Sequence, residues 1–510
     1  MKAFLMYRDR DFDLERELPA HAADLGKDLE LRTLLDAMAA GDRFLLQAAN
    51  AAVLASLDDP EAILYRQAIL ADCLAQPGVA REIYALACEA MEREKRVYGG
   101  FYSVLPDGLL SRSVEVLQMF VGILKRLRQF AEDHRASFRS EGFTTLFEML
   151  ITELDDEYFA SIEEHLRRLK LKDGILMSAD LGTGNHGGNY VLRRRVSKQS
   201  WKERIGLPDR PGYVYQIADR DESGMQALAE LRGRGTSLVA SAVGRSTDHI
   251  LSFFRMLRAE LAFYVGCLNL RERLAEIGEP TCMPEPMGVG TAGLSGRGLV
   301  DVSLSLTLGE RVVGNDLDAD RRHLVMVTGA NRGGKSTFLR SVGVAHLMMQ
   351  CGMFVAADSF RASVCRGVFT HFKREEDATM QSGKLDEELG RMSAIVDELS
   401  SQSLVLLNES FASTNEREGS EIARQIVRAL LAAGIKVIYV THLFELAQSL
   451  HVEQLPDALF LRAERLADGR RTFRVVEGQP LPTSHGGDLY RRVFGAVLDA
   501  TPAAADAGLA

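Results

Sequence analysis

The amino-terminal half of the chain carries apolar side chains at helical spacing. In the segment 28–38 they recur three and four residues apart, at Leu31, Leu34, Leu35 and Met38. This periodicity places them on one face of an α-helix. Similar stripes predict further helices over 44–57, 62–74, 81–91, 111–134, 143–171 and 248–277. Ordinary core packing explains any single stripe, so the pattern predicts a helical domain but no particular function.

The carboxyl-terminal half instead contains short, continuous apolar runs. They are Leu324–Val327, Leu404–Leu407 and the run that follows Lys436 in Lys436–Val440. Runs of this length are typical of parallel strands that are covered on both faces. The sequence therefore predicts a helical domain over 1–286 and an α/β domain over 287–497. An Ala-rich tail over 498–510 is expected to be disordered.

A glycine-rich loop joins the first of these strands to a predicted helix. It fits the phosphate-binding pattern G-x-x-x-x-G-K-S, with Thr337 following, and its residues are Gly329, Ala330, Asn331, Arg332, Gly333, Gly334, Lys335 and Ser336. Glycines let successive backbone N–H groups turn toward phosphate oxygens, while Lys335 reaches the terminal phosphates and Ser336 offers its hydroxyl to Mg²⁺. The strand before the loop and the helix after it argue against a chance match. The sequence therefore predicts a site for a nucleoside triphosphate.

Polar residues at the ends of the next two strands are candidates for catalysis. Asn408 and Glu409 end the second strand, and His442 follows the third. The carboxyl ends of parallel strands border the ligand crevice of such sheets. We expect Glu409 to orient or deprotonate a water against the γ-phosphate, and Asn408 to be a neutral oxygen ligand of Mg²⁺; a solvated acid is the alternative for Glu409. His442 is placed to sense the γ-phosphate, although a structural role is more frequent for a histidine at a strand end.

A second group of backbone donors lies between the P-loop and Glu409. The sequence Gln381-Ser382-Gly383-Lys384 leads into a helical run over 385–399. The start of a helix attracts phosphate, so Ser382 and Gly383 are candidate nucleotide contacts. The signal is weak by itself.

Together these motifs resemble the ATPase domain of the MutS family, the DNA mismatch repair ATPases, which are distant relatives of ABC-type ATPases. The family's P-loop, T-G-P-N-M-G-G-K-S-T, is similar to residues 328–337, and its T-H-x-F-E-L is present whole at 441–446. Its D-E-x-G-R-G-T is altered at 408–414, where Asn408 replaces the aspartate. Its S-G-R-S-T keeps only Ser382 and Gly383, because Leu385 replaces the second serine. Asn315 upstream and the segment 59–67 also resemble family signatures.

The resemblance implies an ABC-like P-loop ATP hydrolase that uses ATP and Mg²⁺. It implies a head-to-tail homodimer in which Ser382 and Gly383 of one subunit face the P-loop of the other. Lys335, Glu409 and His442 would be the catalytic residues, and Ser336 and Asn408 the metal ligands. We expect slow turnover because of Asn408 and Leu385.

The segment 173–220 is rich in glycine and basic residues. Alternation around Tyr190 and Tyr213 predicts short strands, and so a small basic β element. Its candidate DNA-binding residues are Arg193, Arg194, Arg195, Lys198, Trp201 and Lys202. Cations with an aromatic suit phosphates and exposed bases, although a solvated basic loop is about as frequent. The net charge of −10 does not decide between them, because a local basic surface is sufficient for DNA.

Composition narrows the class of protein. With 510 residues and 46% hydrophobic content, the chain can bury several cores. Its six cysteines show no C-x-x-C pairing, which argues against a zinc site or a disulfide framework. No apolar stretch approaches the ~18 residues of a membrane helix, and residues 1–16 are too charged for a signal peptide. We therefore expect a cytoplasmic protein with no membrane partner.

Mismatch-reading members of the family begin with a domain whose Phe-x-Glu motif meets the mispair. Here the helical pattern begins near the first residue, and the nearest similarity, Gly100–Ser103, lacks the glutamate. We therefore expect a family member without the mismatch-recognition domain.

Two functions remain open from the sequence. The first is a MutS-like ATPase that binds distorted or branched duplex DNA, and that uses ATP to close a dimer in mismatch repair or recombination, with a repair protein as a further partner. The second is an ATP-sensing scaffold that binds a protein, hydrolyses little and does not bind DNA. Asn408, Leu385 and the expected lack of a mismatch-recognition domain favour the scaffold.

Overall fold

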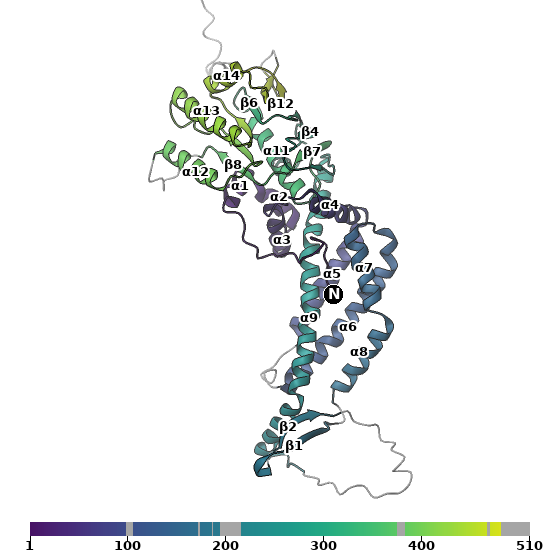
Figure 1. Cartoon of the computed structure of the whole chain (residues 1–510). Helices are drawn as coiled ribbons and strands as arrows, with labels where there is room; N and C mark the ends of the chain where they lie inside the picture. Colours follow the sequence, from purple (N-terminus) through teal and green to yellow (C-terminus); the bar gives the residue numbers. More distant parts are fainter. Residues whose placement is uncertain are drawn as a thin grey trace, which may run out of the picture. The chain divides into compact units, whose positions relative to one another are not determined.

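The computed structural model describes residues 1–97, 106–171, 174–185, 187–193, 216–374, 383–466 and 470–480. The chain forms two compact units that are interleaved in sequence. Unit 1 comprises Met1–Phe12 and Ala75–Leu261, and unit 2 comprises Asp13–Leu74 and Ala262–Ala510. Unit 1 consists mainly of helices, whereas unit 2 contains the six-stranded and the four-stranded sheet (Figure 1).

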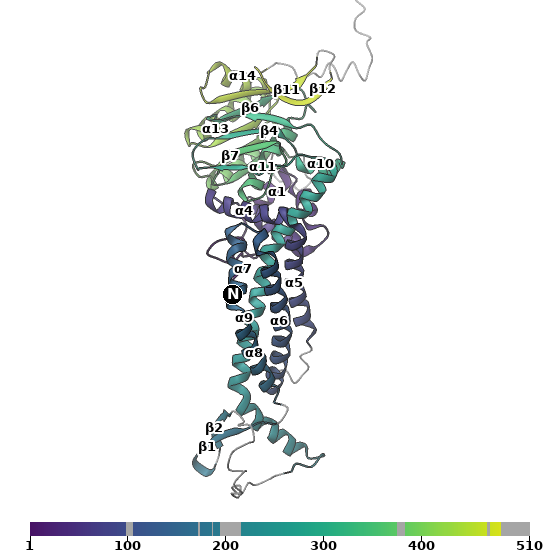
Figure 2. The same cartoon turned by 90° about the vertical axis from the view of Figure 1, so that its right-hand side faces the viewer.

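Unit 1 is built from long helices that run side by side (Figure 2). They are α5 (Pro77–Arg96), α6 (Pro106–His134), α7 (Glu141–Glu153), α8 (Asp156–Leu169) and the first part of α9 (Glu222–Ile277). Helix α6 packs against α5, α7 and α8. The stripe over 143–171 belongs to two helices because Asp155 begins the second one, where its side chain accepts a 2.7 Å hydrogen bond from the N–H of Tyr158.

Helix α9 begins well before residue 248, where the apolar pattern starts. Residues 222–247 bury few side chains, among them Thr236, Ala240 and Val243, so no stripe marks them in the sequence. Near this end lies an antiparallel hairpin of β1 (Met177–Leu181) and β2 (Gly187–Leu192), which includes Tyr190. A Cβ on Gly235 of α9 would lie 1.8 Å from the sulfur of Met177, so a side chain there would require the Met177 side chain to move. Tyr213 lies outside the described residues.

A buried carboxylate fixes the amino-terminal segment of unit 1 to α9. Glu260 is fully buried, and Leu5 donates its backbone N–H to Oε2 of this side chain. Burial raises the pKa of Glu260 to about 7, although backbone N–H groups of Leu5, Phe12 and Met6 act in the opposite direction. The residue therefore titrates near neutral pH.

The main sheet of unit 2 has six strands in the order β12-β11-β6-β10-β9-β8. They are β6 (Leu324–Thr328), β8 (Val368–Phe372), β9 (Leu404–Asn408), β10 (Lys436–Val440), β11 (Ala458–Arg465) and β12 (Arg471–Glu477). All neighbours are parallel except β12, which is antiparallel to β11. The three strands expected from apolar runs are thus β6, β9 and β10, and they are neighbours. Their carboxyl ends meet at one edge of the sheet.

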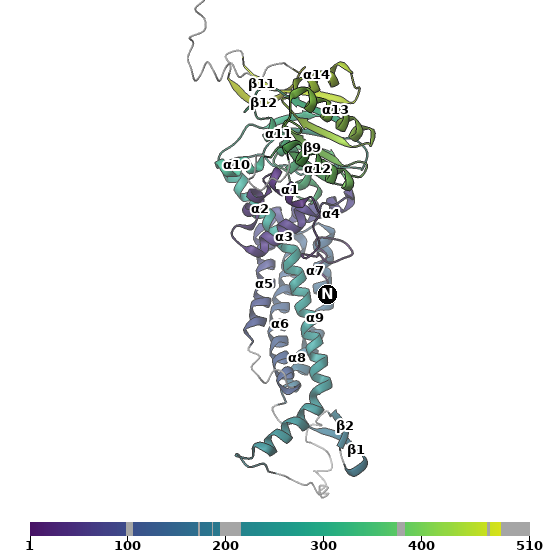
Figure 3. The same ribbon diagram turned by 90° about the vertical axis from the view of Figure 1, so that its left-hand side faces the viewer.

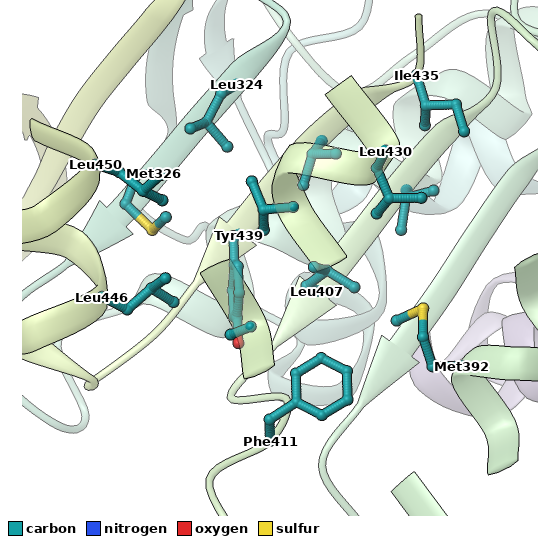
Figure 4. Packing of buried hydrophobic residues seen from close by; sticks show 14 of the residues in the cluster. Leu324, Met326, Met392, Leu407, Phe411, Leu430, Ile435, Tyr439, Leu446 and Leu450 are labelled. Atoms are coloured by element: carbon teal, nitrogen blue, oxygen red, sulfur yellow. The ribbon is translucent and has the colours of Figure 1, made fainter. Parts of the chain in front are cut away.

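Helices cover both faces of this sheet. One face packs against α12 (Lys384–Glu398), α13 (Glu416–Ala432) and α14 (Phe444–Val452), of which α13 and α14 lie side by side (Figure 3). Met326, Leu407 and Tyr439 point into this core, together with Phe411 and Leu446 (Figure 4).

The other face packs against α11 (Lys335–Gln350), which contacts β8, β9 and β10. On α11, a Cβ at Gly343 would lie 2.6 Å from Cδ1 of Leu406, so glycine permits a close approach of helix and strand.

A second sheet in unit 2 has the order β3-β7-β4-β5. Its strands are β3 (Glu285–Met287), β4 (Leu294–Leu299), β5 (Asn315–Asp318) and β7 (Ser359–Ser363), and α10 (Val302–Leu308) follows β4.

Helices from the amino-terminal part of the chain complete unit 2. They are α1 (Ala22–Asp28), α2 (Leu31–Ala39), α3 (Arg43–Leu54) and α4 (Pro60–Ala75). Helix α1 contacts β8, α2 contacts α10, and α3 contacts α11. In α4, Arg66 is fully buried and donates a 3.2 Å hydrogen bond to the carbonyl of Cys351, while Gln67 donates one of 3.0 Å to that of Pro284. The Arg-Gln pair of the 59–67 motif therefore anchors α4 to the unit that holds the sheet.

Among the described residues, no helix combines the length and apolar character that crossing a lipid bilayer requires. The tail over 498–510 lies outside the described residues.

Candidate nucleotide site

The P-loop connects β6 to α11, and its glycines are required by its shape. Gly334 has φ 92° and is the N-cap of α11, a conformation that side chains disfavour. A Cβ on Gly333 would lie 2.8 Å from Cβ of Ala463 and 2.9 Å from the carbonyl of Ala330. Asn331 and Arg332 are exposed, and Thr337 is half-buried in the first turn of α11. The backbone therefore forms a turn at the amino end of a helix, the arrangement that binds phosphate.

Lys335 is held inside this loop. Its ammonium donates hydrogen bonds of 2.9 Å to the carbonyl of Gly329 and 3.2 Å to that of Ala330. Burial lowers the pKa of Lys335, while the negative charge of Glu409 acts to raise it. An ammonium has three N–H bonds, so one remains for a phosphate oxygen.

Ser336 and Asn408 are brought together from α11 and the end of β9. The hydroxyl of Ser336 donates a 2.9 Å hydrogen bond to Oδ1 of Asn408. Hydroxyl and amide oxygens are hard ligands, which suits Mg²⁺ in company with phosphate oxygens. The two residues proposed as metal ligands are therefore adjacent.

Glu409 lies directly after β9 in a left-handed backbone conformation, with φ 54°. Its N–H donates a 2.8 Å hydrogen bond to the carbonyl of Val440, which fixes this turn to β10. Oε2 of Glu409 lies 3.8 Å from Nδ1 of His442. The interaction with His442 is the main cause of the lowered pKa of Glu409. The positive charges of Lys335 and Lys373 also lower this pKa, whereas burial acts to raise it. The carboxylate is thus kept ionised, as a group that accepts a proton or orients water must be.

His442 is fixed by the residues on either side of it. Thr441 donates its N–H to the carbonyl of Val327 at 3.0 Å, and its hydroxyl accepts a 3.0 Å hydrogen bond from the N–H of Leu443. Oε1 of Glu416 accepts a 2.9 Å hydrogen bond from the N–H of Phe444 at the start of α14. The sequence did not indicate this role of Glu416, because it depends on a contact between α13 and the loop after β10.

Gly383 lies at the start of α12 as its N-cap, with an extended backbone. Ser382 lies outside the described residues.

A cavity of about 790 Å³ is lined by residues of β4, β5, β7, β11 and β12. Val312, Asn315, Leu461 and Arg474 contribute to its lining. Asn315 is buried, accepts a 2.7 Å hydrogen bond from the N–H of Val475 and donates one of 3.3 Å to the carbonyl of Phe473. That carbonyl would lie 3.1 Å from a Cβ on Gly334, so β12, which lines part of the cavity, comes close to the P-loop. The family-like Asn315 therefore fixes β12 over the nucleotide loop, a role that the sequence alone did not reveal.

Of the candidate DNA-binding residues, the structure describes Arg193. It is exposed at the end of β2, where its Nε donates a 2.8 Å hydrogen bond to the hydroxyl of Ser178. The other candidates lie outside the described residues, and they are Arg194, Arg195, Lys198, Trp201 and Lys202.

Comparison with known proteins agrees with this geometry. The family model "MutS2 N-terminal domain" matches residues 58–277, and "MutS domain V" matches residues 325–486. MutS domain V is a P-loop ATPase domain, and its match contains β6 except for Leu324, the P-loop, Glu409 and His442.

The chain is also similar to several proteins that are named DNA mismatch repair protein MutS. It is 34% identical to that of Thermotoga petrophila over 171 residues, which are 33% of this chain and 22% of the relative. It is 31% identical to that of Parabacteroides distasonis over 279 residues, 53% of this chain and 32% of the relative. It is 27% identical to that of Flavobacterium psychrophilum over 315 residues, 60% of this chain and 35% of the relative. The chain thus spans about a third or less of the length of these relatives. One family model matches residues 58–277 and the other matches the residues that contain the P-loop, so the chain belongs to the MutS family.

Proposed function

We propose that the protein is a MutS-like ATPase that binds DNA and uses ATP binding and hydrolysis to close a dimer. The observation that carries this proposal is the convergence of Ser336, Asn408, Glu409 and His442 beside the P-loop. In this site the P-loop amides and Lys335 hold the phosphates, and Ser336 and Asn408 hold Mg²⁺. The cavity beside Asn315 receives the nucleoside. Magnesium neutralises charge on the phosphate oxygens when it is bound.

Hydrolysis depends on an ionised carboxylate near the γ-phosphate. Glu409 orients the attacking water and accepts its proton, and His442 keeps that carboxylate ionised and contacts the γ-phosphate. Turnover is slow because an amide at Asn408 is a weaker magnesium ligand than a carboxylate. Gly383 and Ser382 contact the nucleotide of a second copy of the chain. Duplex DNA, distorted or branched, is the substrate on which the dimer closes, in mismatch repair or recombination.

The scaffold remains the second candidate because of one observation. Asn408 occupies the metal position, and its amide oxygen is satisfied by Ser336. A protein with this pair could bind MgATP and recruit a repair protein while hydrolysing little.

Steady-state ATPase activity of the full chain separates the two functions. It is measured without DNA and with homoduplex, mismatched and branched duplexes, and the Lys335→Ala variant is the control for contaminating ATPases. We expect slow hydrolysis that branched DNA stimulates more than a single mispair does. Tight MgATP binding without hydrolysis, and without DNA binding at low salt, would establish the scaffold instead.

A further inference from the structure

His371 forms a buried contact between the catalytic turn and α12. It lies on β8 and its side chain is fully buried. Nδ1 of its ring is 2.8 Å from Oγ of Ser410, the residue after Glu409, and Nε2 is 3.0 Å from the carbonyl oxygen of Glu388 on α12. The ring also stacks on Phe411, with centroids 5.3 Å apart and planes 17° apart. One side chain therefore touches both the Glu409 turn and the helix that begins at Gly383.

The turn that contains Ser410 is strained and closely held. Glu409 and Phe411 both have positive φ, at 54° and 62°. The hydroxyl of Ser410 donates a 2.6 Å hydrogen bond to the carbonyl of His371, and the carbonyl of Ser410 accepts one of 2.6 Å from the hydroxyl of Tyr439. Strained backbone of this kind persists only where its surroundings fix it. The position of the Glu409 carboxylate therefore depends on these contacts.

When the ring of His371 is neutral, His371 and Ser410 together have too few hydrogens to donate to every acceptor around them. The carbonyl of Glu388 accepts only, so the contact at Nε2 requires a hydrogen there. Ser410 gives its single hydrogen to the carbonyl of His371, so the contact at Nδ1 also requires a hydrogen on the ring. A neutral imidazole carries one hydrogen and the imidazolium carries two. Either neutral tautomer therefore leaves one contact of the network without a donor.

The surroundings of the ring favour its neutral form. Burial lowers the pKa of His371 to about 4, and the positive charges of Arg391 on α12 and Arg374 after β8 act in the same direction. Of the acidic groups nearby, Glu388 accepts a 2.7 Å hydrogen bond from the hydroxyl of Ser413, and burial raises the pKa of Asp28 on α1. The ring therefore has one hydrogen at neutral pH.

We propose that His371 is a positioning residue for hydrolysis, and that it couples the Glu409 turn to α12 by changing its tautomer. With the hydrogen on Nδ1, the ring holds Ser410 and thereby Glu409. With the hydrogen on Nε2, it donates to the carbonyl of Glu388 on α12 and accepts a hydrogen bond at Nδ1 from Ser410, whose hydroxyl then no longer donates to the carbonyl of His371. Each state lacks one hydrogen bond, so the two lie close in free energy, and a small displacement of α12 at the dimer interface is sufficient to shift the balance. This inference rests on the proposed ATPase function.

Two substitutions separate the two contacts of the ring. The amide nitrogen of asparagine takes the place of Nδ1, whereas that of glutamine takes the place of Nε2. His371→Asn therefore keeps a donor for Ser410, and we expect kcat within about threefold of the parent. His371→Gln and Ser410→Ala lose the contact to the turn, and we expect kcat to fall about tenfold with KM for ATP within about threefold, the scale of one buried hydrogen bond.

The control is His346→Gln. His346 is as buried as His371, its Nδ1 lies 2.9 Å from the carbonyl of Val342, and it is on α11 away from the turn. We expect this variant to lower the midpoint temperature of thermal unfolding as much as His371→Gln does, and to leave kcat unchanged. Equal kcat for His371→Asn and His371→Gln, or a fall in kcat that follows the thermal midpoint in all variants, would reduce His371 to a packing residue.

The tautomer itself is observed by nitrogen NMR of the full chain with ¹⁵N-labelled histidine at pH 7.5. The His371 signals are identified by their loss in His371→Asn. We expect a neutral ring whose tautomer ratio changes between the nucleotide-free, MgADP and MgATPγS states. A doubly protonated ring, or one tautomer in every state, would overturn the switch. If the parent binds these nucleotides but does not hydrolyse ATP, the proposed function fails while the NMR result still decides the tautomer exchange.

Discussion

The hydroxyl of Ser336 donates a 2.9 Å hydrogen bond to the amide oxygen of Asn408. The residue that offers a magnesium ligand from the P-loop helix is thus linked directly to the residue that replaces the usual carboxylate at the end of β9. The amide accepts this hydrogen bond without a charge. Its exchange for a carboxylate therefore tests metal affinity with little change in shape.

The variant Asn408→Asp should lower the magnesium concentration at half-maximal hydrolysis. An ionised oxygen is a stronger ligand for a hard cation than an amide carbonyl is. The measurement is a magnesium titration of steady-state ATPase activity. Asn415→Asp is the matched control, because Asn415 caps α13 by accepting a hydrogen bond from the N–H of Glu418 and aspartate caps equally well. If the magnesium concentration at half-maximal hydrolysis stays the same or rises in Asn408→Asp, the site is adapted to the amide.

Substitution of Glu409 should separate chemistry from binding. We expect Glu409→Gln to lower kcat by roughly two orders of magnitude or more, the scale of general-base loss, while ATP affinity changes by a few fold. Lys335→Ala should instead weaken MgATP binding, since its charge contacts the ground state as well as the transition state. Both constants are measured by single-turnover hydrolysis and equilibrium binding, with the exposed Glu421→Gln as control. Unchanged turnover in Glu409→Gln would remove Glu409 from the mechanism.

The contact between His442 and Glu409 predicts a shift in the pH profile. Glu409 acts only when ionised, and its lowered pKa keeps it ionised as the pH falls. Because His442 is the main cause of that lowering, His442→Ala should raise the pKa of Glu409 and move the acid limb of kcat to higher pH. His451→Ala, which alters a histidine on α14 that packs on Phe460, should leave the limb in place. If the acid limb of kcat in the His442→Ala variant stays at the parental pH, a group other than Glu409 limits the rate.

Much of the site could be predicted from the sequence because its signals are local. Glycine spacing in 329–334 and the apolar run before it specify a strand, a tight turn and a helix, and these form as expected. The adjacency of Ser336 and Asn408 follows from the rule that parallel strands end at one edge of a sheet.

Features that depend on distant contacts could not be predicted in this way. Helices α1 to α3 carry the same stripes as the helices of unit 1, and nothing in their periodicity shows that they pack with the sheet. His371 lies in an ordinary strand pattern, and its role depends on Ser410 and Glu388, which are remote in sequence. The Ala463 contact that requires glycine at 333 depends on the pairing of β11 with β6.

The buried Glu260 predicts a pH dependence of stability. Its pKa of about 7 in the folded chain lies above the ordinary value of 4.5, so folding takes up a proton between these values. The stability that depends on this group is therefore fully present below about pH 4.5, declines as the pH rises toward 7, and is constant above that. Urea unfolding of the full chain at pH 5 and pH 8 measures the decline. Glu260→Gln should reduce it, whereas Glu115→Gln, an exposed position on α6, should not.

The basic segment after β2 predicts a salt-dependent contact with DNA. We expect replacement of Arg193, Arg194 and Arg195 by alanine to weaken binding to all duplex sequences alike. Each lost phosphate contact should take about 0.9 from the slope of log K against log salt. ATP affinity should not change, because these residues are remote in sequence from the P-loop and Arg193 belongs to the other compact unit.

The control for this variant is alanine at Arg167 and Arg168, two arginines on α8 that pair with Glu164. Their charges are already matched by a carboxylate, so their loss should alter the salt slope less than the loss of the arginines after β2. Fluorescence anisotropy with homoduplex, single-mismatch and branched DNA at several salt concentrations measures both variants. A parental slope in the Arg193–Arg195 variant would exclude these arginines from the DNA contact. A strong preference of the parent for a simple mispair would contradict this prediction and would require a mismatch-reading element elsewhere.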